Sequence, residues 1–147
     1  MRYNTSTMEA DMIDDVRLEG FTLAVEDVNR SVEFYGNKLG LVVEANRAPT
    51  FAMIRVGGPL GGTIGLLSTH LPEAAGARTM TPERRAAIQV ELSTDNLDAL
   101  YEQLKARGVH FHRPPKDMPW ERSMQTYDPD GYTVEFAQGR RGHNKPA

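Results

Sequence analysis

One glutamate, Glu135, lies in the alternating stretch TVEFA that follows the sharp turn DPDG. In a strand, Tyr132, Val134 and Phe136 point to one face, and Glu135 points to the other. A carboxylate on a half-buried concave surface binds its proton more tightly unless another group partners it. Glu135 is therefore a candidate general base. The alternative is that Glu135 is a surface charge on the terminal strand.

A second candidate for chemistry is the pair His110 and His112. Both histidines alternate with apolar residues, so they share one face of a predicted strand. A His-x-His pair on a strand occurs at metal sites. The alternative is that both are polar groups on an open sheet face, bonded to water or to Glu91. In that case the polar side of a binding site would be lined by Gln89, Glu91 and Glu135.

Aromatic and methionine side chains could form an apolar surface beside these polar residues. They come from the segment PPKDMPWERSMQTY and from the strand FAMIR. Polarizable methionine and amphipathic tryptophan suit the wall of a site for a flat ligand, although some of these residues will belong to the core. The candidate ligand-binding residues from the two segments are Met118, Trp120, Met124, Tyr127, Phe51, Met53 and Arg55.

The elements that must position these residues follow a plan that occurs twice. In the first copy, an alternating strand precedes a helix that is capped by Asp27 and ends at Gly40. In the second copy, Asn96 caps the helix and Gly108 ends it. Short extended segments with turns between them follow each helix, so each half is predicted to be a β-α-β-β-β unit.

This repeat divides the chain into parts that form one domain overall. A breaker-rich stretch separates the two units, and polar segments flank them. We predict a leader at 1–17, a first βαβββ module at 18–68, a linker at 69–85, a second module at 86–138 and a tail at 139–147.

The entry VEDVNRSVEFYGNKLGL, the exit DPDGYTVEF and the duplicated plan resemble the vicinal oxygen chelate superfamily. That superfamily includes glyoxalase I, the extradiol dioxygenases and the bleomycin-resistance proteins. The resemblance implies an α+β fold in which eight strands form a cupped pseudo-barrel with the helices outside. It also implies a homodimer.

The resemblance further implies where a metal would bind, since family members with metal chemistry take ligands from the first and last strands of each module. In the second module the matching positions are Gln89 and Glu135. In the first module they are Gly20 and Gly65, which have no ligand side chain. Because half of such a site is missing, we expect no metal and no other cofactor.

Composition excludes several other classes of function. The net charge of −3 and the pI near 5.8 give no electrostatic reason to expect a nucleic acid or an anionic membrane as partner. No apolar run is as long as a membrane span. The absence of cysteine excludes disulfides and a cysteine nucleophile. We therefore expect a cytoplasmic protein whose partners are a small molecule and a second copy of itself.

Two functions remain open on this sequence. In the first, favoured by the missing ligands, the protein sequesters a bulky aromatic molecule such as an antibiotic in a dimer cup. In the second, it is a metal-dependent lyase, isomerase or dioxygenase that uses Gln89 and Glu135.

Overall fold

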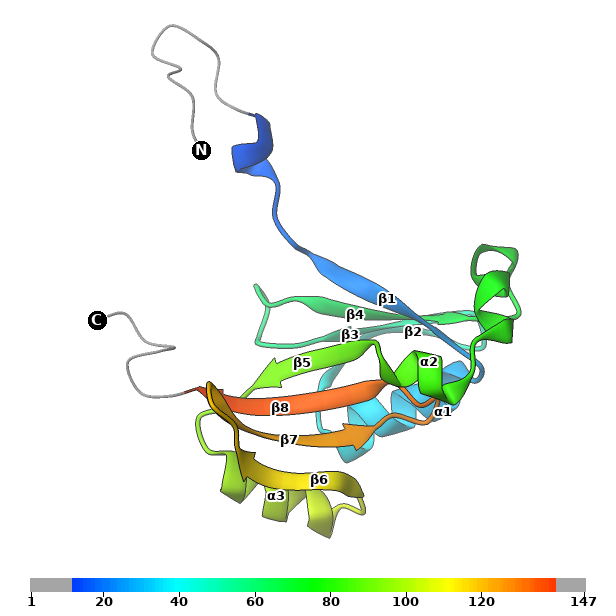
Figure 1. Cartoon of the computed structure of the whole chain (residues 1–147). Helices are drawn as coiled ribbons and strands as arrows, with labels where there is room; N and C mark the ends of the chain where they lie inside the picture. Colours follow the sequence, from blue (N-terminus) through cyan, green and yellow to red (C-terminus); the bar gives the residue numbers. More distant parts are fainter. Residues whose placement is uncertain (1–11, 140–147) are drawn as a thin grey trace, which may run out of the picture.

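The computed structural model describes residues 12–139. Most of the predicted leader and nearly all of the predicted tail lie outside these residues. In the described part of the leader, Met12–Asp15 form a 3-10 helix, η1, which stands away from the body of the molecule (Figure 1). No described helix is long and apolar enough to cross a membrane.

Each half of the chain forms the predicted βαβββ module. The elements of module 1 are β1 (Gly20–Val25), α1 (Val28–Val32), a π-helical continuation η2 (Glu33–Lys38), β2 (Val42–Arg47), β3 (Phe51–Arg55) and β4 (Thr63–Ser68). The elements of module 2 are β5 (Gln89–Ser93), α3 (Leu97–Ala106), β6 (Phe111–Asp117), β7 (Glu121–Tyr127) and β8 (Thr133–Gly139).

The predicted helix boundaries are confirmed by their caps. The side chain of Asp27 accepts a hydrogen bond from the backbone of Arg30, and Asn96 caps α3 in the same way. These bonds satisfy amide groups that have no partner inside a helix. Gly40 and Gly108 then adopt φ angles of 79° and 91°, which a residue with a side chain rarely adopts.

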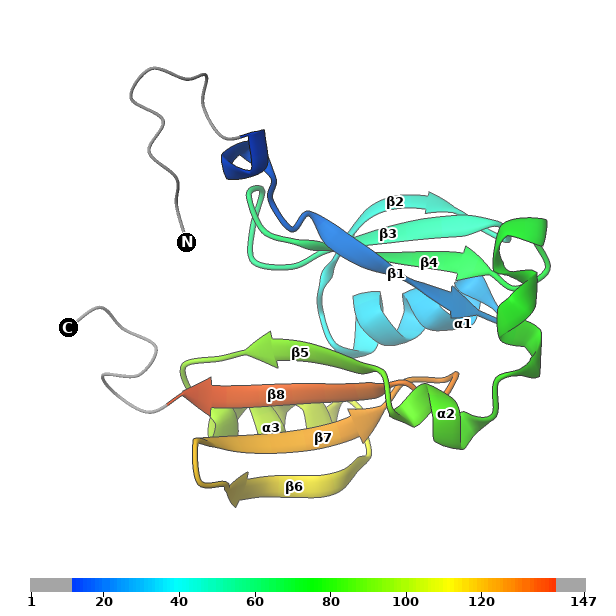
Figure 2. The ribbon, with the colours of Figure 1, turned by 45° about the horizontal axis from the view of Figure 1, so that its top comes forward.

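The strands form two separate four-stranded sheets. Sheet A has the order β1-β4-β3-β2, and sheet B has the order β5-β8-β7-β6. In the described part of the chain, no strand of one sheet pairs with a strand of the other, so the sheets do not close into a barrel. Figure 2 shows β1 and β5 as the neighbouring edges, with α1 and α3 behind the sheets. The helix-free faces of both sheets therefore turn toward the same side.

The two modules have the same strand register. The first strand of each pairs in parallel with the last, and Gly20 lies opposite Thr63 just as Gln89 lies opposite Thr133. Residues at corresponding places in the two modules can therefore be compared directly.

A single apolar core joins the helices to the sheets. On α1 and η2, Val28 and Tyr35 are fully buried, as the helical spacing predicts. On α3, Leu97 and Leu104 are buried in the same way. These residues belong to one continuous cluster that spans both modules, so the two halves share a core and do not fold as independent units.

Two buried carboxylates in the DPDG turn fasten module 2 to module 1. Asp128 accepts a hydrogen bond from the Tyr35 hydroxyl at 2.7 Å, and Asp130 accepts one from the backbone N–H of Glu26 at 2.9 Å. Asp130 also lies 3.5 Å from the Arg30 guanidinium. The Tyr132 hydroxyl, in turn, donates to the carbonyl of Ala24 on β1. This turn, which the sequence shows as a loop, is thus a buried joint.

Two segments contain regular structure that the sequence analysis does not predict. The predicted linker contains a 3-10 helix, η3 (Pro72–Thr79), and a short helix, α2 (Pro82–Ala86). Each begins with a proline, whose fixed φ suits the first helical turn. The strand that carries His112 continues through Pro114 and Pro115. Prolines are tolerated there because β6 is an edge strand with register shifts.

The joint predicts an unusual pH dependence of stability. Burial raises the pKa of Asp128 from 3.8 to about 6, and its hydrogen bonds oppose this rise only in part. A carboxyl group whose pKa is higher in the folded state stabilises the fold below its unfolded pKa, and this contribution is lost as pH rises through about 6. The expected loss between pH 4 and pH 7 is up to roughly 3 kcal/mol.

Asp128→Asn should remove this pH-dependent contribution, because an amide side chain does not ionise. The amide oxygen can still accept the backbone hydrogen bonds of Asp130 and Tyr132, so the turn should keep its structure. Urea unfolding of both proteins at pH 4 and pH 7 measures the effect. The variant should gain stability relative to the parent at pH 7 but not at pH 4. A stability difference that is the same at both pH values would contradict the prediction.

Candidate functional site

The open faces of the two sheets, defined as the faces without a helix, carry most of the predicted site residues. On the open face of sheet B, one row of side chains crosses all four strands. Glu91 pairs with Glu135, Glu135 with Gln125, and Gln125 with Arg113. Residues paired across neighbouring strands point to the same face. Glu135 therefore lies within a polar row on the open face of sheet B.

Glu135 is held by two donors at one oxygen. Gln125 Nε2 donates to Glu135 Oε2 at 2.9 Å, and Arg113 Nη2 lies 3.3 Å from the same atom. Arg113 also donates to the hydroxyl of Ser123 at 2.8 Å. The Glu135 side chain is only 13% exposed, so these partners stabilise a carboxylate that water reaches poorly. A carboxylate engaged in this way is better suited to fixing its neighbours than to abstracting a proton.

A further carboxylate, Glu121, marks the end of this face at the start of β7. Burial raises the pKa of Glu121, and the negative charges of Glu135 and Glu91 raise it further. A hydrogen bond from the Trp120 side chain acts in the opposite direction. The charges of Glu91 and Glu135 therefore act on Glu121 from the open face of sheet B.

His112 also belongs to this face. Its ring stacks on Tyr127 with a centroid distance of 3.8 Å and an interplanar angle of 9°, and its Nε2 lies 3.3 Å from Gln125 Oε1. His110 precedes β6, and its carbonyl accepts a hydrogen bond from Thr126. The contact of His112 is thus with Gln125, and not with Glu91 as the open alternative suggested.

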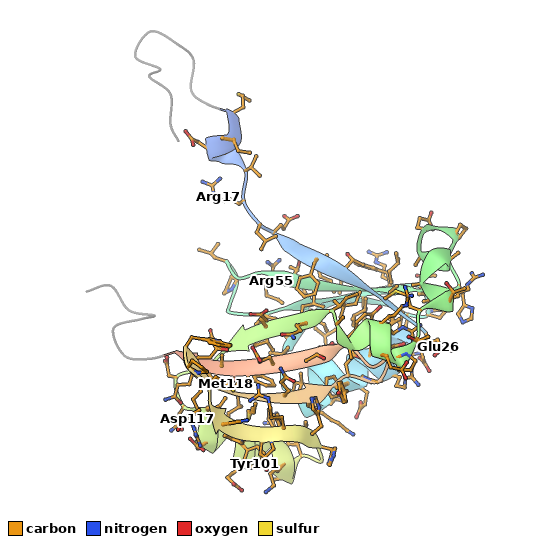
Figure 3. All side chains as sticks on the ribbon, viewed as in Figure 1. Arg17, Glu26, Arg55, Tyr101, Asp117 and Met118 are labelled. Carbon is orange, nitrogen blue, oxygen red and sulfur yellow. The ribbon has the colours of Figure 1, made fainter. Side chains whose placement is uncertain are left out.

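The methionine and tryptophan candidates separate into different places. Met124 is fully buried in the core, on the side of β7 opposite Gln125, so it does not lie on the open face with the other candidates. Trp120 is 58% exposed in the turn between β6 and β7. Met118, labelled in Figure 3 at that end of sheet B, donates its backbone N–H to the carbonyl of Glu121.

The open face of sheet A is less polar. Phe51, Met53 and Arg55 alternate along β3, and all three are half-buried on this face. The Arg55 guanidinium, labelled in Figure 3, pairs with Glu44 at 2.7 Å and donates to the carbonyl of Gly61. Because Arg55 already has a carboxylate partner, Phe51 and Met53 are the groups on β3 that remain for an apolar ligand.

The glycines of module 1 supply no metal ligand, and their neighbours lie close to them. By the shared register, Gly20 corresponds to Gln89, and Gly65 corresponds to Glu135. A Cβ at Gly20 would overlap the Thr63 carbonyl, and a Cβ at Gly65 would lie 2.8 Å from the Thr22 hydroxyl. At Gly20 the contact is with backbone, so this position is packed for glycine, whereas at Gly65 a larger residue would have to displace the Thr22 side chain.

The residues present therefore do not fit a divalent metal of the kind that the resemblance implies. Within residues 12–139, no three His, Asp or Glu side chains form a group that could hold a metal ion. Gln89 and Glu135 alone supply two ligands, and Glu135 is already bonded to Arg113. Two ligands are too few for the tetrahedral or octahedral sites of protein-bound metals.

A cleft of about 220 Å³ lies where the two sheets meet. Phe21 and Thr63 line it from sheet A, and Val90 and Glu91 line it from sheet B. Pockets for drug-sized ligands measure roughly 300–1,000 Å³. The cleft alone is therefore too small for a bulky ligand, which would have to spread over the open faces.

Sequence reasoning did not find the residues that organise the row. Gln125 and Ser123 alternate with Met124 along β7, and this pattern was a usable signal of a polar face. Arg113 carried no such signal, because the register shift between Phe111 and Arg113 cannot be read from the sequence.

The fold and the open polar face define a two-module α+β protein of the glyoxalase type. The Glyoxalase/Bleomycin resistance protein/Dioxygenase superfamily matches residues 17–136, and the chain belongs to this superfamily. This finding confirms the resemblance and the fold class. No curated protein with which the chain was compared matches it.

Solved structures give the same fold. TnmS3, an antibiotic binding protein from Streptomyces sp. CB03234, is 25% identical with a TM-score of 0.67, over 85% of this chain and 97% of that chain. A glyoxalase/bleomycin resistance protein/dioxygenase from Nocardioides is 27% identical with a TM-score of 0.66, over 97% and 94% of the chains. UcmS2, at 23% identity and a TM-score of 0.72 over 84% and 98%, shows the fold alone.

The packed glycines predict that the purified protein holds no divalent metal tightly. Elemental analysis after purification without added metal should find well below one Zn, Ni, Mn or Fe per chain. Near one equivalent that disappears in Glu135→Ala, but not in the matched variant Glu102→Gln on the helix side of sheet B, would overturn this prediction.

Proposed function

We propose that the protein binds a bulky aromatic small molecule on its open faces and sequesters it without chemical change. The observation that carries the proposal is the fixed polar row of sheet B beside the stacked pair His112 and Tyr127. A surface of oriented polar groups next to an aromatic plane suits recognition of a flat, partly polar molecule. Phe51 and Met53 on sheet A offer an apolar surface on the same side.

An antibiotic is the ligand class that we propose. The support is the similarity to TnmS3, which is described as an antibiotic binding protein. The lack of module 1 metal ligands favours binding over metal-dependent chemistry. We place this function in the cytoplasm, as expected from the sequence.

A second copy of the chain completes the proposed site. The open faces are broad and shallow, and a bulky ligand gains most affinity when most of its surface is buried. Apolar side chains are also exposed at the sheet margins, including Phe21 on β1 and Val42 on β2, which is 60% exposed. Covering such residues favours association of two copies.

Ligand binding should change the fluorescence of Trp120, the only tryptophan. The indole lies next to Glu121 at the margin of the open face, where it can contact a ligand held by the row. Titration with glycopeptide, anthraquinone and bithiazole antibiotics should give a saturable change in emission for at least one class. Calorimetry should show that Trp120→Ala raises the Kd of that compound roughly three- to tenfold, as expected for loss of one aromatic contact.

Glu102→Gln, on the exposed surface of α3, is the matched control and should leave the Kd unchanged. If calorimetry detects a micromolar ligand while the emission stays constant and Trp120→Ala binds equally well, Trp120 is outside the site. If no antibiotic binds and a metal-supplemented protein instead turns over substrates of lyases or dioxygenases, the proposed function is wrong.

The dimer has its own test. Light scattering at tens of micromolar protein should give about twice the chain mass of 16.4 kDa. A mass that stays near 16.4 kDa would contradict the proposed dimer.

A further inference from the structure

The hydrogen bonds of the polar row fix which ring nitrogen of His112 carries its proton. The Glu135 carboxylate accepts hydrogen bonds and is paired with Arg113, so the Gln125 group that faces it must be the amide NH₂. The amide oxygen of Gln125 then faces His112 Nε2 at 3.3 Å. An amide oxygen only accepts hydrogen bonds, so His112 Nε2 must be the donor.

This assignment leaves an acceptor on the other side of the ring. In a neutral imidazole with the proton on Nε2, Nδ1 carries a lone pair. Within the described part of the chain, no hydrogen bond reaches His112 Nδ1, and the His112 side chain is exposed. Arg113, Glu135 and Gln125 therefore act as positioning residues that present one acceptor nitrogen at the surface of the site.

The stack on Tyr127 adds a direction to this acceptor. The two rings are nearly parallel, at 9°, with centroids 3.8 Å apart, and Tyr127 is 48% exposed. The lone pair of Nδ1 lies in the plane of the imidazole. A donor to Nδ1 must therefore lie in this plane, and a planar ring that carries the donor can lie parallel to the Tyr127 ring and continue the layer above it.

We propose that His112 and Tyr127 form a recognition subsite for a planar aromatic ring with a hydroxyl or N–H donor at its edge. The donor bonds to His112 Nδ1, and the ring extends the layer that His112 begins over Tyr127. This inference rests on the proposed function and specifies the chemistry of the ligand. A ligand whose edge carries only acceptors meets the lone pair of Nδ1 and is disfavoured.

The first test concerns the free protein and needs no ligand. Long-range ¹H–¹⁵N NMR spectra of the neutral imidazoles distinguish the two tautomers of His112. The parent protein should show the Nε2–H tautomer, and Gln125→Leu should show a mixture because the accepting amide oxygen is gone. An Nδ1–H tautomer in the parent, or no change in Gln125→Leu, would overturn the inference.

The second test uses the matched probes 2-naphthol and 2-methoxynaphthalene, which differ in one donor hydrogen. NMR titration above pH 7 should show that 2-naphthol binds about three- to tenfold more tightly, the usual effect of one net hydrogen bond. His112→Phe keeps an aromatic ring over Tyr127 and removes the acceptor, so this preference should disappear. Glu102→Gln, on the exposed surface of α3, should preserve the preference.

The outcomes separate the two proposals. Equal affinity of the probes for the parent, or a preference that persists in His112→Phe, overturns the subsite alone. Failure of both probes to bind, while a larger antibiotic binds, also overturns the subsite and leaves the proposed function standing. Failure of every compound to bind overturns both.

Discussion

The buried joint at Asp128 and Asp130 is the constraint on which the arrangement of the two modules depends. Both carboxylates are nearly inaccessible to water, and their partners come from the β1–α1 junction and from η2, on Tyr35. Leaving a buried carboxylate without partners would cost several kcal/mol, on the order of 3–5 kcal/mol for a broken buried pair. The joint therefore sets the position of β8 relative to β1, and through β8 it places Glu135 on the same side of the molecule as the open face of sheet A.

The shared register shows how one backbone plan carries two different surfaces. Gln89 and Glu135 project from module 2 at the places where module 1 has Gly20 and Gly65. In module 1, Phe51 and Met53 are half-buried on the face that these glycines leave without side chains. In module 2, the same strand pairing supports a row of mutually oriented polar groups. The open face of module 1 is thus more apolar and that of module 2 more polar because equivalent strands carry different side chains.

The features that could be predicted from the sequence are those determined locally. The caps Asp27 and Asn96, the helix ends and the alternating strands depend on neighbours only a few residues away, and the structure confirms them. The polar environment of Glu135 followed from alternation, but its partners did not, since Arg113 reaches it only through a register shift in β6. The burial of Met124 could not be predicted, because alternation shows that two faces exist without showing which face the helix covers.

The two prolines of β6 have a consequence for the behaviour of the protein at high concentration. A free sheet edge offers unpaired N–H and C=O groups to any other extended chain, which is a common start of aggregation. Pro114 and Pro115 have no N–H group, and the ladder is irregular between Arg113 and Lys116. Growth of sheet B by addition of a foreign strand is therefore interrupted at its outer edge, and a chain that exposes such broad sheet surfaces is protected against fibre formation on this side.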